Sequence, residues 1–203
     1  MPNITKATLS RLPLYLQYIR SSVSEERTSA SAIARGLGLG EVLVRKDLSL
    51  VCEAGRPKLG YQTAILSSAL EDVLGVYQYV PAVIAGAGKL GMALMGYDGF
   101  AEYGLEIAAA FDCDPAKAGM CYAGKTVYPM DRLADYCQTH NVRIGVLTVP
   151  APSAQEVCDE MIQSGITAIW NFAPRALNVP EHVTVQQENL ALSLAHLRLT
   201  AIR

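Results

Sequence analysis

The stretch that decides the fold is VIAGAGKLGMALM, residues 83–95 of a 203-residue chain. A short apolar run enters a turn with glycines at Gly86, Gly88 and Gly91, and the chain then continues as an apolar segment of helical character. In such a strand–turn–helix the first glycine permits the tight turn, the second lets the backbone approach a pyrophosphate, and the third lets the helix pack close to the strand. The amide groups at the start of that helix would face the anion. The stretch predicts a dinucleotide-binding turn; the alternative is a glycine turn that only connects strand to helix.

A carboxylate further along the chain supports the nucleotide interpretation. Asp112 ends the run LEIAAAFD, 21 residues beyond Gly91, where an acidic side chain can accept hydrogen bonds from ribose hydroxyls. An acid there favours NAD(H) over NADP(H), because it would repel the extra phosphate. Ligands of open α/β sheets bind at the carboxyl ends of the strands. Two later loops follow predicted strands on that edge, Thr148-Val149-Pro150 and Asn171-Phe172-Ala173-Pro174.

From about residue 78 onward, short apolar runs alternate with helical segments. The runs are apolar on consecutive positions, as in strands buried on both faces of a parallel sheet. They lie at 81–88, 105–112, 125–129, 143–150, 166–174 and 182–187, and helices fit 88–99, 129–140 and 153–164. The pattern predicts a doubly wound, Rossmann-type α/β domain over residues 78–187.

The first 77 residues have a different organisation. Apolar residues at spacings of three and four predict a helix over 11–23. Ser29 or Ser31 can cap a short helix that ends near Leu37. A second helix is expected from Glu41 to about Val51. In that helix we expect four residues to face the core (Val42, Leu43, Leu48 and Val51) and three to face outward (Arg45, Lys46 and Ser49).

The segment EAGRPKLGYQTAIL, residues 53–66, follows this helix-turn-helix pattern. Its glycines and proline alternate with Arg56 and Lys58, as expected of a basic β-hairpin wing. Residues 1–65 carry a net charge of +4 and the remainder −6, for a total of −2. A basic N-terminal region on an otherwise acidic chain suggests that this region binds an anionic partner. The alternative is a small helical subdomain with ordinary surface charges.

Several protein classes are disfavoured by what the sequence lacks. There is no apolar run of 18 residues, and the N-terminus does not resemble a secretory signal, so we expect a cytoplasmic protein with no membrane partner. The five cysteines include no CxxC pair, and we expect buried, reduced thiols and no metal site. The three histidines, His140, His182 and His196, are poorly placed to serve as a proton donor. A cofactor site without an evident reaction favours a sensor over an enzyme.

The C-terminal segment, residues 188–203, is predicted to be a dimerisation helix. Its apolar residues are distributed almost all round the helix, and such a helix has to be buried on every face. These residues are Leu190, Leu192, Leu194, Leu197, Leu199 and Ile202. We expect the helix to be held between two subunits.

The chain as a whole resembles the Rex family of redox-sensing transcriptional repressors. The resemblance rests on the nucleotide turn together with RLPLYLQYI, VRKDLS, GYQ, FDCDPAKAG, LTVPA, NFAP and LNVPEHV, which occur in the family's order over nearly the whole chain. It implies a winged-helix DNA-binding domain, a Rossmann domain that binds NADH, and a homodimer with exchanged C-terminal helices. Such repressors hold a palindromic operator when NADH is scarce and release it when the NADH/NAD⁺ ratio rises.

The resemblance and the motifs together give two sets of candidate site residues. For the cofactor, NADH or NAD⁺, they are Gly86, Ala87, Gly88, Lys89, Leu90, Gly91, Tyr97, Asp112, Cys113, Lys117, Thr148, Val149, Pro150, Asn171, Phe172 and Ala173. For DNA they are Arg11, Ser31, Arg45, Lys46, Ser49, Arg56, Lys58, Gly60 and Tyr61. Tyr97 matches a tyrosine that some members use near the nicotinamide to sense redox state.

The sequence departs from the family pattern at several of these places. Leu50, Val51 and Cys52 replace an aromatic pair and glycine, and Pro57 stands where the family's wing has arginine. The usual charged partners of the redox-sensing tyrosine align with the neutral Gln17 and Asn189. We predict an NADH-responsive repressor that is not an enzyme. The alternatives are an NAD-dependent oxidoreductase and a nucleotide-binding paralogue whose DNA switch is altered or lost.

Overall fold

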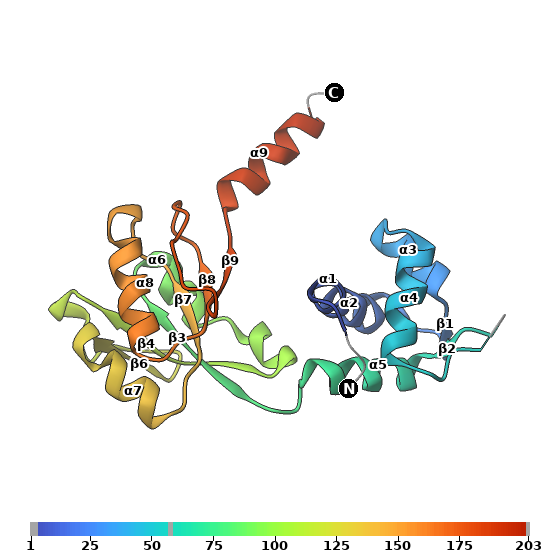
Figure 1. The fold of residues 1–203 in the computed structure, drawn as a ribbon, viewed down its shortest axis with the longest axis horizontal. Helices are drawn as coiled ribbons and strands as arrows, with labels where there is room; N and C mark the ends of the chain where they lie inside the picture. The colour runs from blue at the N-terminus through green and yellow to red at the C-terminus, as the bar shows by residue number, and fades with distance from the viewer. Residues whose placement is uncertain (1–3, 57–58, 202–203) are drawn as a thin grey trace. The chain divides into compact units, whose positions relative to one another are not determined.

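The computed structural model describes residues 4–56 and 59–201, without the side chains at 193, 196, 199 and 200 (Figure 1). The chain divides into two compact units, residues 1–78 and 79–203, so the division falls one residue later than the expected boundary. Each unit has its own buried apolar residues.

The first unit is built from helices and one small antiparallel sheet. Its helices are α1 (Lys6–Leu9), α2 (Leu12–Ser22), α3 (Ala30–Leu37), α4 (Glu41–Val51) and α5 (Thr63–Leu74), and the sheet pairs β1 (Arg27–Thr28) with β2 (Tyr61–Gln62). The Ser29 hydroxyl accepts a hydrogen bond from the Ala32 N–H at 3.1 Å, so Ser29 rather than Ser31 caps α3. The unit has the helix-turn-helix and the small sheet of a winged helix.

The buried face of α4 differs from the one expected. Val44, Asp47 and Leu48 are buried, whereas Val42 is 79% exposed and Leu43 is 39% exposed. The expectation was right for Leu48 and wrong for Val42 and Leu43, because it did not consider that the polar Asp47 could lie on the core side. A carboxylate with buried hydrogen-bonding partners occupies the core-facing stripe, and this rotates Val42 and Leu43 away from the core.

The wing also differs in detail. Among the described residues of 53–66, the two arms of the expected hairpin meet only at the bridge between Arg56 and Gly60. The main pairing joins β1 to β2, with Thr28 opposite Tyr61. Gly60 has φ +66°, and a Cβ atom there would lie 2.2 Å from the Thr28 carbonyl oxygen, so only glycine fits this close approach. Pro57 and the candidate Lys58 lie outside the described residues.

The second unit contains a seven-stranded sheet in the order β5-β6-β4-β3-β7-β8-β9. The strands are β3 (Val80–Ala85), β4 (Leu105–Asp112), β5 (Cys121–Tyr122), β6 (Lys125–Pro129), β7 (Ile144–Leu147), β8 (Ala168–Asn171) and β9 (Thr184–Gln187). Every pairing is parallel except that of β5 with β6. The chain order reverses at β3, whose neighbours are β4 and β7, which confirms the doubly wound Rossmann-type sheet. The short edge strand β5 was not predicted.

Helices cover both faces of this sheet. Helices α7 (Leu133–Thr139) and α8 (Ala154–Gln163) pack against one face through residues such as Leu133 and Met161, while α6 (Lys89–Met95) covers the other through Met95. The helix expected over 88–99 ends at Met95, and a 3₁₀ helix follows over Asp98–Tyr103. Other 3₁₀ turns span Pro115–Lys117, Met130–Arg132 and Ala151–Ser153.

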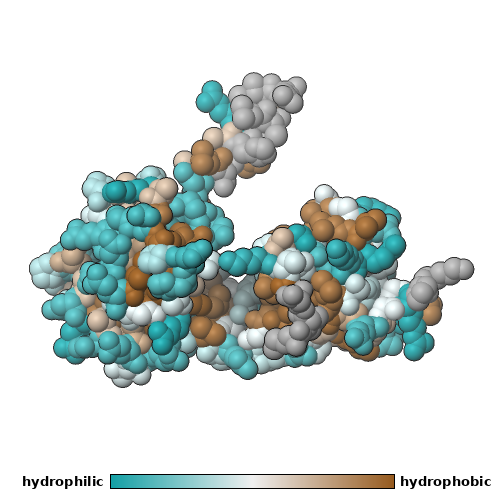
Figure 2. All heavy atoms as spheres, viewed as in Figure 1, coloured by the Kyte–Doolittle hydropathy of each residue, from teal (hydrophilic) through white to brown (hydrophobic). Residues whose placement is uncertain are grey.

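The last helix, α9 (Leu190–Ala201), is long and apolar as expected. Leu190, Leu192, Leu194 and Leu197 are 60–69% exposed, and apolar atoms are visible at the beginning of this helix in Figure 2. The side chain of Leu199 and the whole of Ile202 lie outside the described residues. Within the described part of the chain, no helix is long and apolar enough to cross a membrane.

The cysteines follow the expectation only in part. All five are free thiols, and Cys52, Cys137 and Cys158 are buried. Burial raises the pKa of Cys137 and of Cys158 to about 11, which keeps both thiols protonated and unreactive. Cys113 and Cys121 are exposed, because they lie in the segments that follow β4 and form the edge strand β5.

Candidate nucleotide site and DNA-binding surface

The glycine-rich turn sits between the carboxyl ends of β4 and β7. Gly86 has φ +103°, and its N–H donates to the Phe111 carbonyl at 2.7 Å. The Thr148 hydroxyl donates to the Gly86 carbonyl at 2.7 Å. A Cβ atom at Gly86 would lie 3.0 Å from the Thr148 backbone and 2.9 Å from Val149 Cγ1, which leaves no room for a side chain. The turn is therefore held on both sides by the neighbouring strands.

The other two glycines of the turn have different surroundings. A Cβ atom at Gly91 would lie 2.0 Å from the Gly86 carbonyl oxygen, so Gly91 is what lets α6 pack against the turn. A Cβ atom at Gly88 would meet nothing within 4 Å. The space beside Gly88 is open to a ligand, and a larger side chain there would occupy it.

Asp112 lies at the end of β4 beside the turn, as the sequence indicated. It is 9% exposed, and its Oδ2 accepts hydrogen bonds from the Ala87 N–H and from Lys117 Nζ, each at 2.8 Å. Its Oδ1 accepts from the Asp114 N–H at 2.9 Å. A carboxylate offers about four acceptor positions, so three are in use and one remains for a ribose hydroxyl. Burial by itself would raise the pKa of Asp112, but the hydrogen bonds from Lys117, Asp114 and Ala87 outweigh it and lower the pKa, so the group is ionised.

Lys117 changes the charge that a nucleotide would meet here. Its hydrogen bond to Asp112 raises the pKa of the ammonium group, and the side chain is 32% exposed. The ion pair is neutral as a unit, with a cation on its more exposed side. From sequence alone Asp112 was taken as an isolated negative charge, and this pairing was not predicted.

Asn171 has a role that sequence reasoning did not anticipate. Its side chain is fully buried, with Nδ2 donating to the Arg175 carbonyl at 2.9 Å and to Gln187 Oε1 at 2.6 Å. Its Oδ1 accepts from the Ala173 N–H at 2.9 Å. The amide holds the loop after β8 in shape, and these bonds point it into the fold instead of toward a ligand.

A chain of aromatic rings joins Tyr97 to this same loop. Ring centroids are 5.0 Å apart for Tyr97 and Phe100, 6.0 Å for Phe100 and Trp170, and 4.4 Å for Trp170 and Phe172, all in edge-to-face arrangements. Tyr97 is 58% exposed and lies just past the end of α6. A series of ring contacts thus links the redox-sensing candidate to β8 and to the loop that follows it.

The candidate cofactor residues gather at the carboxyl edge of the sheet, except Tyr97 beyond α6. They differ in exposure. Gly88, Lys89, Tyr97, Cys113 and Pro150 are exposed; Leu90, Lys117, Thr148, Val149 and Phe172 are half-buried; Gly86, Ala87, Gly91, Asp112, Asn171 and Ala173 are buried. Among the described residues, no group of three or more His, Cys, Asp or Glu side chains could hold a metal ion.

The first unit carries a groove of ≈ 790 Å³ between the wing and the helix-turn-helix. Its polar lining consists of three arginines, four hydroxyl-bearing residues and one acidic residue, Glu25. The lining includes Arg27, Arg45, Arg56, Ser29, Ser31, Gly60 and Tyr61. Cationic and hydroxyl side chains around a groove next to a helix-turn-helix are the groups that contact DNA phosphates.

The outer face of α4 is as predicted. Arg45, Lys46 and Ser49 are all exposed. Arg45 forms an ion pair with Glu41 one turn earlier, and the Ser49 hydroxyl donates to the Lys46 carbonyl at 2.8 Å. Exposed pairs of this kind cost little to break, so Arg45 can exchange Glu41 for a phosphate.

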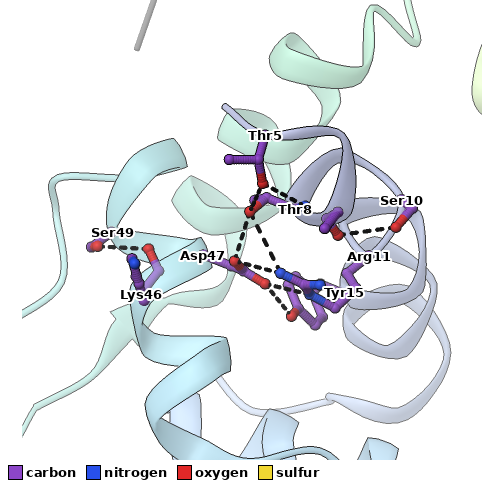
Figure 3. A network of polar contacts seen from close by, with 9 residues as sticks. Thr5, Thr8, Ser10, Arg11, Tyr15, Lys46, Asp47 and Ser49 are labelled. Atoms are coloured by element: carbon purple, nitrogen blue, oxygen red, sulfur yellow. Dashed lines mark hydrogen bonds and ion pairs between the residues drawn. The ribbon is translucent and has the colours of Figure 1, made fainter. Parts of the chain in front are cut away.

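Arg11 is engaged inside the unit (Figure 3). Its Nε lies 2.7 Å from Asp47 Oδ2, and its Nη2 lies 2.9 Å from Asp47 Oδ1. The hydroxyls of Tyr15 and Thr8 also donate to Asp47, at 2.7 and 3.0 Å. Burial raises the pKa of Tyr15 to about 12, which keeps it a neutral donor. The guanidinium of Arg11 thus anchors α4 to α2, and its predicted contact with DNA would have to leave this pairing intact.

Two residues of the wing have positions that sequence reasoning did not give. Arg27, which was not predicted, donates from Nε to the Leu59 carbonyl at 2.8 Å and from Nη2 to the Gly60 carbonyl at 3.3 Å. Tyr61 is 7% exposed and belongs to the core, and desolvation raises the pKa of its hydroxyl. Arg27 therefore holds the base of the wing, while the ring of Tyr61 packs beneath it.

Comparisons with known proteins cover nearly the whole chain. Residues 3–49 match the family model described as "Putative DNA-binding protein N-terminus", and residues 79–175 match the one described as "CoA binding domain". The redox-sensing transcriptional repressor Rex of Porphyromonas gingivalis is 42% identical over 95% of this chain and 89% of its own length. This chain belongs to the Rex family of redox-sensing transcriptional repressors.

Other Rex proteins align over a similar extent. The Rex repressor of Pelotomaculum thermopropionicum is 38% identical, with 98% of this chain and 95% of its own length aligned. The Rex repressor of Streptomyces coelicolor is 41% identical, and the alignment covers 94% of this chain and 75% of that protein.

The fold also agrees with crystal structures of a Rex-family repressor, RSP. The complex of RSP with β-NAD⁺ and operator DNA has a TM-score of 0.88 at 28% identity and covers 98% of this chain and 92% of RSP. The complex of RSP with β-NADH has a TM-score of 0.86 at 28% identity and covers 99% of this chain and 95% of RSP. The named relatives are repressors, so the Rex family membership disfavours the oxidoreductase alternative.

Two residues that depart from the Rex pattern have clear local positions. Gln17 is exposed on α2, where its backbone carbonyl accepts from the Ser21 hydroxyl at 2.7 Å. Asn189 precedes α9, and its Oδ1 accepts from the Leu192 N–H at 3.1 Å. Asn189 thus serves as an N-cap, a task that its neutral amide performs well.

Proposed function

We propose that this protein is a homodimeric repressor that binds a palindromic operator when NADH is scarce and leaves it when NADH occupies the Rossmann-type domain. The observation that carries the proposal is the presence, in one Rex-family chain, of an arginine-lined groove at a winged helix and an open nucleotide turn at Gly88. Its target being operator DNA, we place it in the cytoplasm.

DNA binding follows from the charge and geometry of the first unit. Arg45, Lys46 and Ser49 are the exposed side chains of α4 that would meet the major groove and its phosphates. Arg56, next to the wing turn, would contact the adjoining backbone. Ser31 lines the same groove. Two copies related by a twofold axis would place two α4 helices one helical turn of DNA apart, or a multiple of it, which explains the palindrome.

Cofactor binding follows from the second unit. The pyrophosphate of NADH would lie against the open side of Gly88, with a ribose hydroxyl on the remaining acceptor position of Asp112. The nicotinamide would approach the loops at Thr148–Pro150 and Asn171–Ala173, with Tyr97 as the residue that senses its redox state. The family member RSP has been crystallised with β-NAD⁺ and with β-NADH.

The dimer is proposed from α9. Four leucines that are 60–69% exposed stand on a helix whose sequence is apolar nearly all round. A single neighbouring surface would cover one side of such a helix, whereas exchange with a second copy of this chain covers all of it. Because NADH would bind in the unit that carries α9, it can alter the dimer geometry and displace the protein from DNA without touching DNA.

The test is a mobility-shift titration against a palindromic operator, with NADH and NAD⁺ added in turn. We expect tight binding without NADH, little effect of NAD⁺, and release by NADH. If NADH binds the protein while operator affinity stays constant, the protein is the nucleotide-binding paralogue and the sensor proposal fails.

A further inference from the structure

Gln187 connects the loop after β8 to the start of α9. It is the last residue of β9, and it pairs in register with Asn171, the last residue of β8. Although Gln187 is exposed, its amide is fully engaged. Oε1 accepts from Asn171 Nδ2 at 2.6 Å, and Nε2 lies 3.0 Å from the Ala173 carbonyl and 3.3 Å from the Asn171 carbonyl.

The backbone reinforces this connection. The Glu188 N–H donates to the Asn171 carbonyl at 2.8 Å, and Gln187 Nε2 also lies 3.2 Å from the Glu188 carbonyl. Both the carbonyl and the side-chain amide of Asn171 are thereby tied to the end of β9. The loop of Asn171, Phe172 and Ala173 is one of the two that face the proposed nicotinamide position.

There is almost no chain between this junction and the dimer helix. Asn189 caps α9 two residues after Gln187, and the helix begins at Leu190. Only Glu188 and Asn189 separate Gln187 from α9, so a displacement of the loop has to break these hydrogen bonds or move the beginning of α9 with it. Hydrogen-bonded links with two discrete arrangements are how coupling between sites is carried.

We infer that Gln187 is a positioning residue that passes the state of the nucleotide loop to α9, and through α9 to the dimer. The inference rests on the proposed function, because it assumes that NADH binding and operator release are coupled. Gln187 touches neither the turn at Gly86–Gly91 nor Asp112, so its role is in the coupling and not in cofactor affinity.

The test compares Gln187→Ala with unmodified protein and with Gln155→Ala. Gln155 is a matched control in the same unit. Its Nε2 donates to the Asn178 carbonyl and its Oε1 accepts from the Asn178 N–H, each at 2.9 Å. This amide therefore ties α8 to the middle of the β8–β9 connection, whereas the amide of Gln187 ties Asn171 and Ala173 to the end of β9, next to α9. For each protein, NADH affinity is measured by calorimetry, dimerisation by sedimentation, and operator affinity with and without saturating NADH.

We expect the Gln187→Ala variant to remain dimeric. Its affinity for NADH, and its affinity for the operator in the absence of NADH, should each lie within about threefold of those of the unmodified protein. The factor by which NADH weakens operator binding should shrink by roughly 2- to 30-fold, the range over which single substitutions change coupling. Gln155→Ala should keep the full factor. An unchanged factor in Gln187→Ala, or an equal loss in both variants, would overturn the inference.

A second measurement needs no variant. Hydrogen exchange of the Glu188 and Leu192 amides in the unmodified protein should change on NADH binding, since both amides belong to the junction. Constant exchange at both would overturn the inference even if the variant failed to fold. A failure of the proposed function is distinct, because the unmodified protein itself would then show no NADH effect on operator affinity, leaving no coupling for Gln187 to carry.

Discussion

Arg11 and Asp47 form a two-point ion pair, with Nε 2.7 Å from Oδ2 and Nη2 2.9 Å from Oδ1, across 36 residues of sequence. The side chain of Asp47 is 3% exposed and that of Arg11 is 21% exposed. The pair therefore joins α4, the helix proposed to contact DNA, to α2 from the buried side. The orientation of α4 depends on it.

Arg11→Met should lower the free energy of unfolding of the first unit by about 3 kcal/mol, because removing one partner leaves a buried carboxylate without its cation. Arg45→Met is the matched control. Arg45 is 65% exposed, so its loss should change stability by no more than about 0.5 kcal/mol while it weakens operator binding. Urea unfolding of both variants and operator titrations check the contrast. Equal stabilities would contradict a structural role for Arg11.

Acid should destabilise the first unit partly through Asp47. Burial alone would raise the pKa of this carboxyl, but the hydrogen bonds from Arg11, Tyr15 and Thr8 outweigh it and lower the pKa. A lowered folded-state pKa contributes stability that is present above the unfolded value, about 4, and is lost as pH falls through the folded value. Asp47→Asn should be less stable at pH 7, and its deficit should shrink below about pH 4. Melting temperatures of both proteins from pH 7 to 3 measure this, and a pH-independent deficit would refute it.

Gly88→Val should abolish release by NADH and leave operator binding intact. A Cβ atom at Gly88 meets nothing within 4 Å and the backbone is extended there, so the fold accepts a side chain that blocks the pyrophosphate. The matched control is Gly91→Val. Its Cβ would lie 2.0 Å from the Gly86 carbonyl oxygen, so this substitution should destabilise the second unit itself. Calorimetry with NADH, thermal melts and mobility shifts separate the two effects. NADH binding retained in Gly88→Val would rule out this placement of the pyrophosphate.

NADH should bind more tightly than NADPH, and Lys117 should moderate the preference. The Lys117 ammonium lies 2.8 Å from Asp112 Oδ2 and would attract the additional phosphate of NADPH. Lys117→Met should therefore widen the ratio of the two dissociation constants, and Asp112→Asn should narrow it. Each change should amount to about 1–3 kcal/mol, the scale of a hydrogen bond to a charged group. Calorimetric titration of each protein with both cofactors measures these dissociation constants. Equal affinities for NADH and NADPH in the unmodified protein would contradict the prediction.

Truncation before Asn189 should convert the dimer into monomers or aggregate. The shortened chain keeps β9 and Gln187 but loses the exposed leucines of α9. Sedimentation velocity of the full and truncated chains measures the change. A truncated protein that stays dimeric and monodisperse would show that another surface forms the dimer.

Regular elements and the overall fold were predictable because their apolar periodicities are local. The strands of the second unit and the helix over Glu41–Val51 follow from such patterns, and family resemblance supplied the order of the domains. Two-residue strands such as β1 and β5 escaped because they are too short to show a period. The α4 face was misjudged at Val42 and Leu43 because a polar residue, Asp47, occupies the core side.

The interior of the site was harder to predict, since it depends on pairs distant in sequence. Nothing near Arg11 reveals a partner at Asp47, and nothing near Asn171 reveals Gln187, because each contact exists only after helices or strands have been placed side by side. Lys117 lies only five residues from Asp112, yet whether the two side chains meet depends on the 3₁₀ turn between them. Local patterns thus located the turn and the groove but not the ion pairs and amide bonds that shape them.

The hydrogen bonds that fasten the wing use main-chain groups of the wing itself, and their side-chain donor, Arg27, lies outside the hairpin segment. Arg27 grips the main-chain carbonyls of Leu59 and Gly60, and β1 pairs with β2 through backbone bonds. Exchanging the side chains of Arg56 or Leu59 leaves those attachments in place. Substitutions at these exposed positions can therefore change the DNA-contacting surface without removing the hydrogen bonds that hold the wing in place. A repressor of this design can change the operator sequence that it binds and keep its fold.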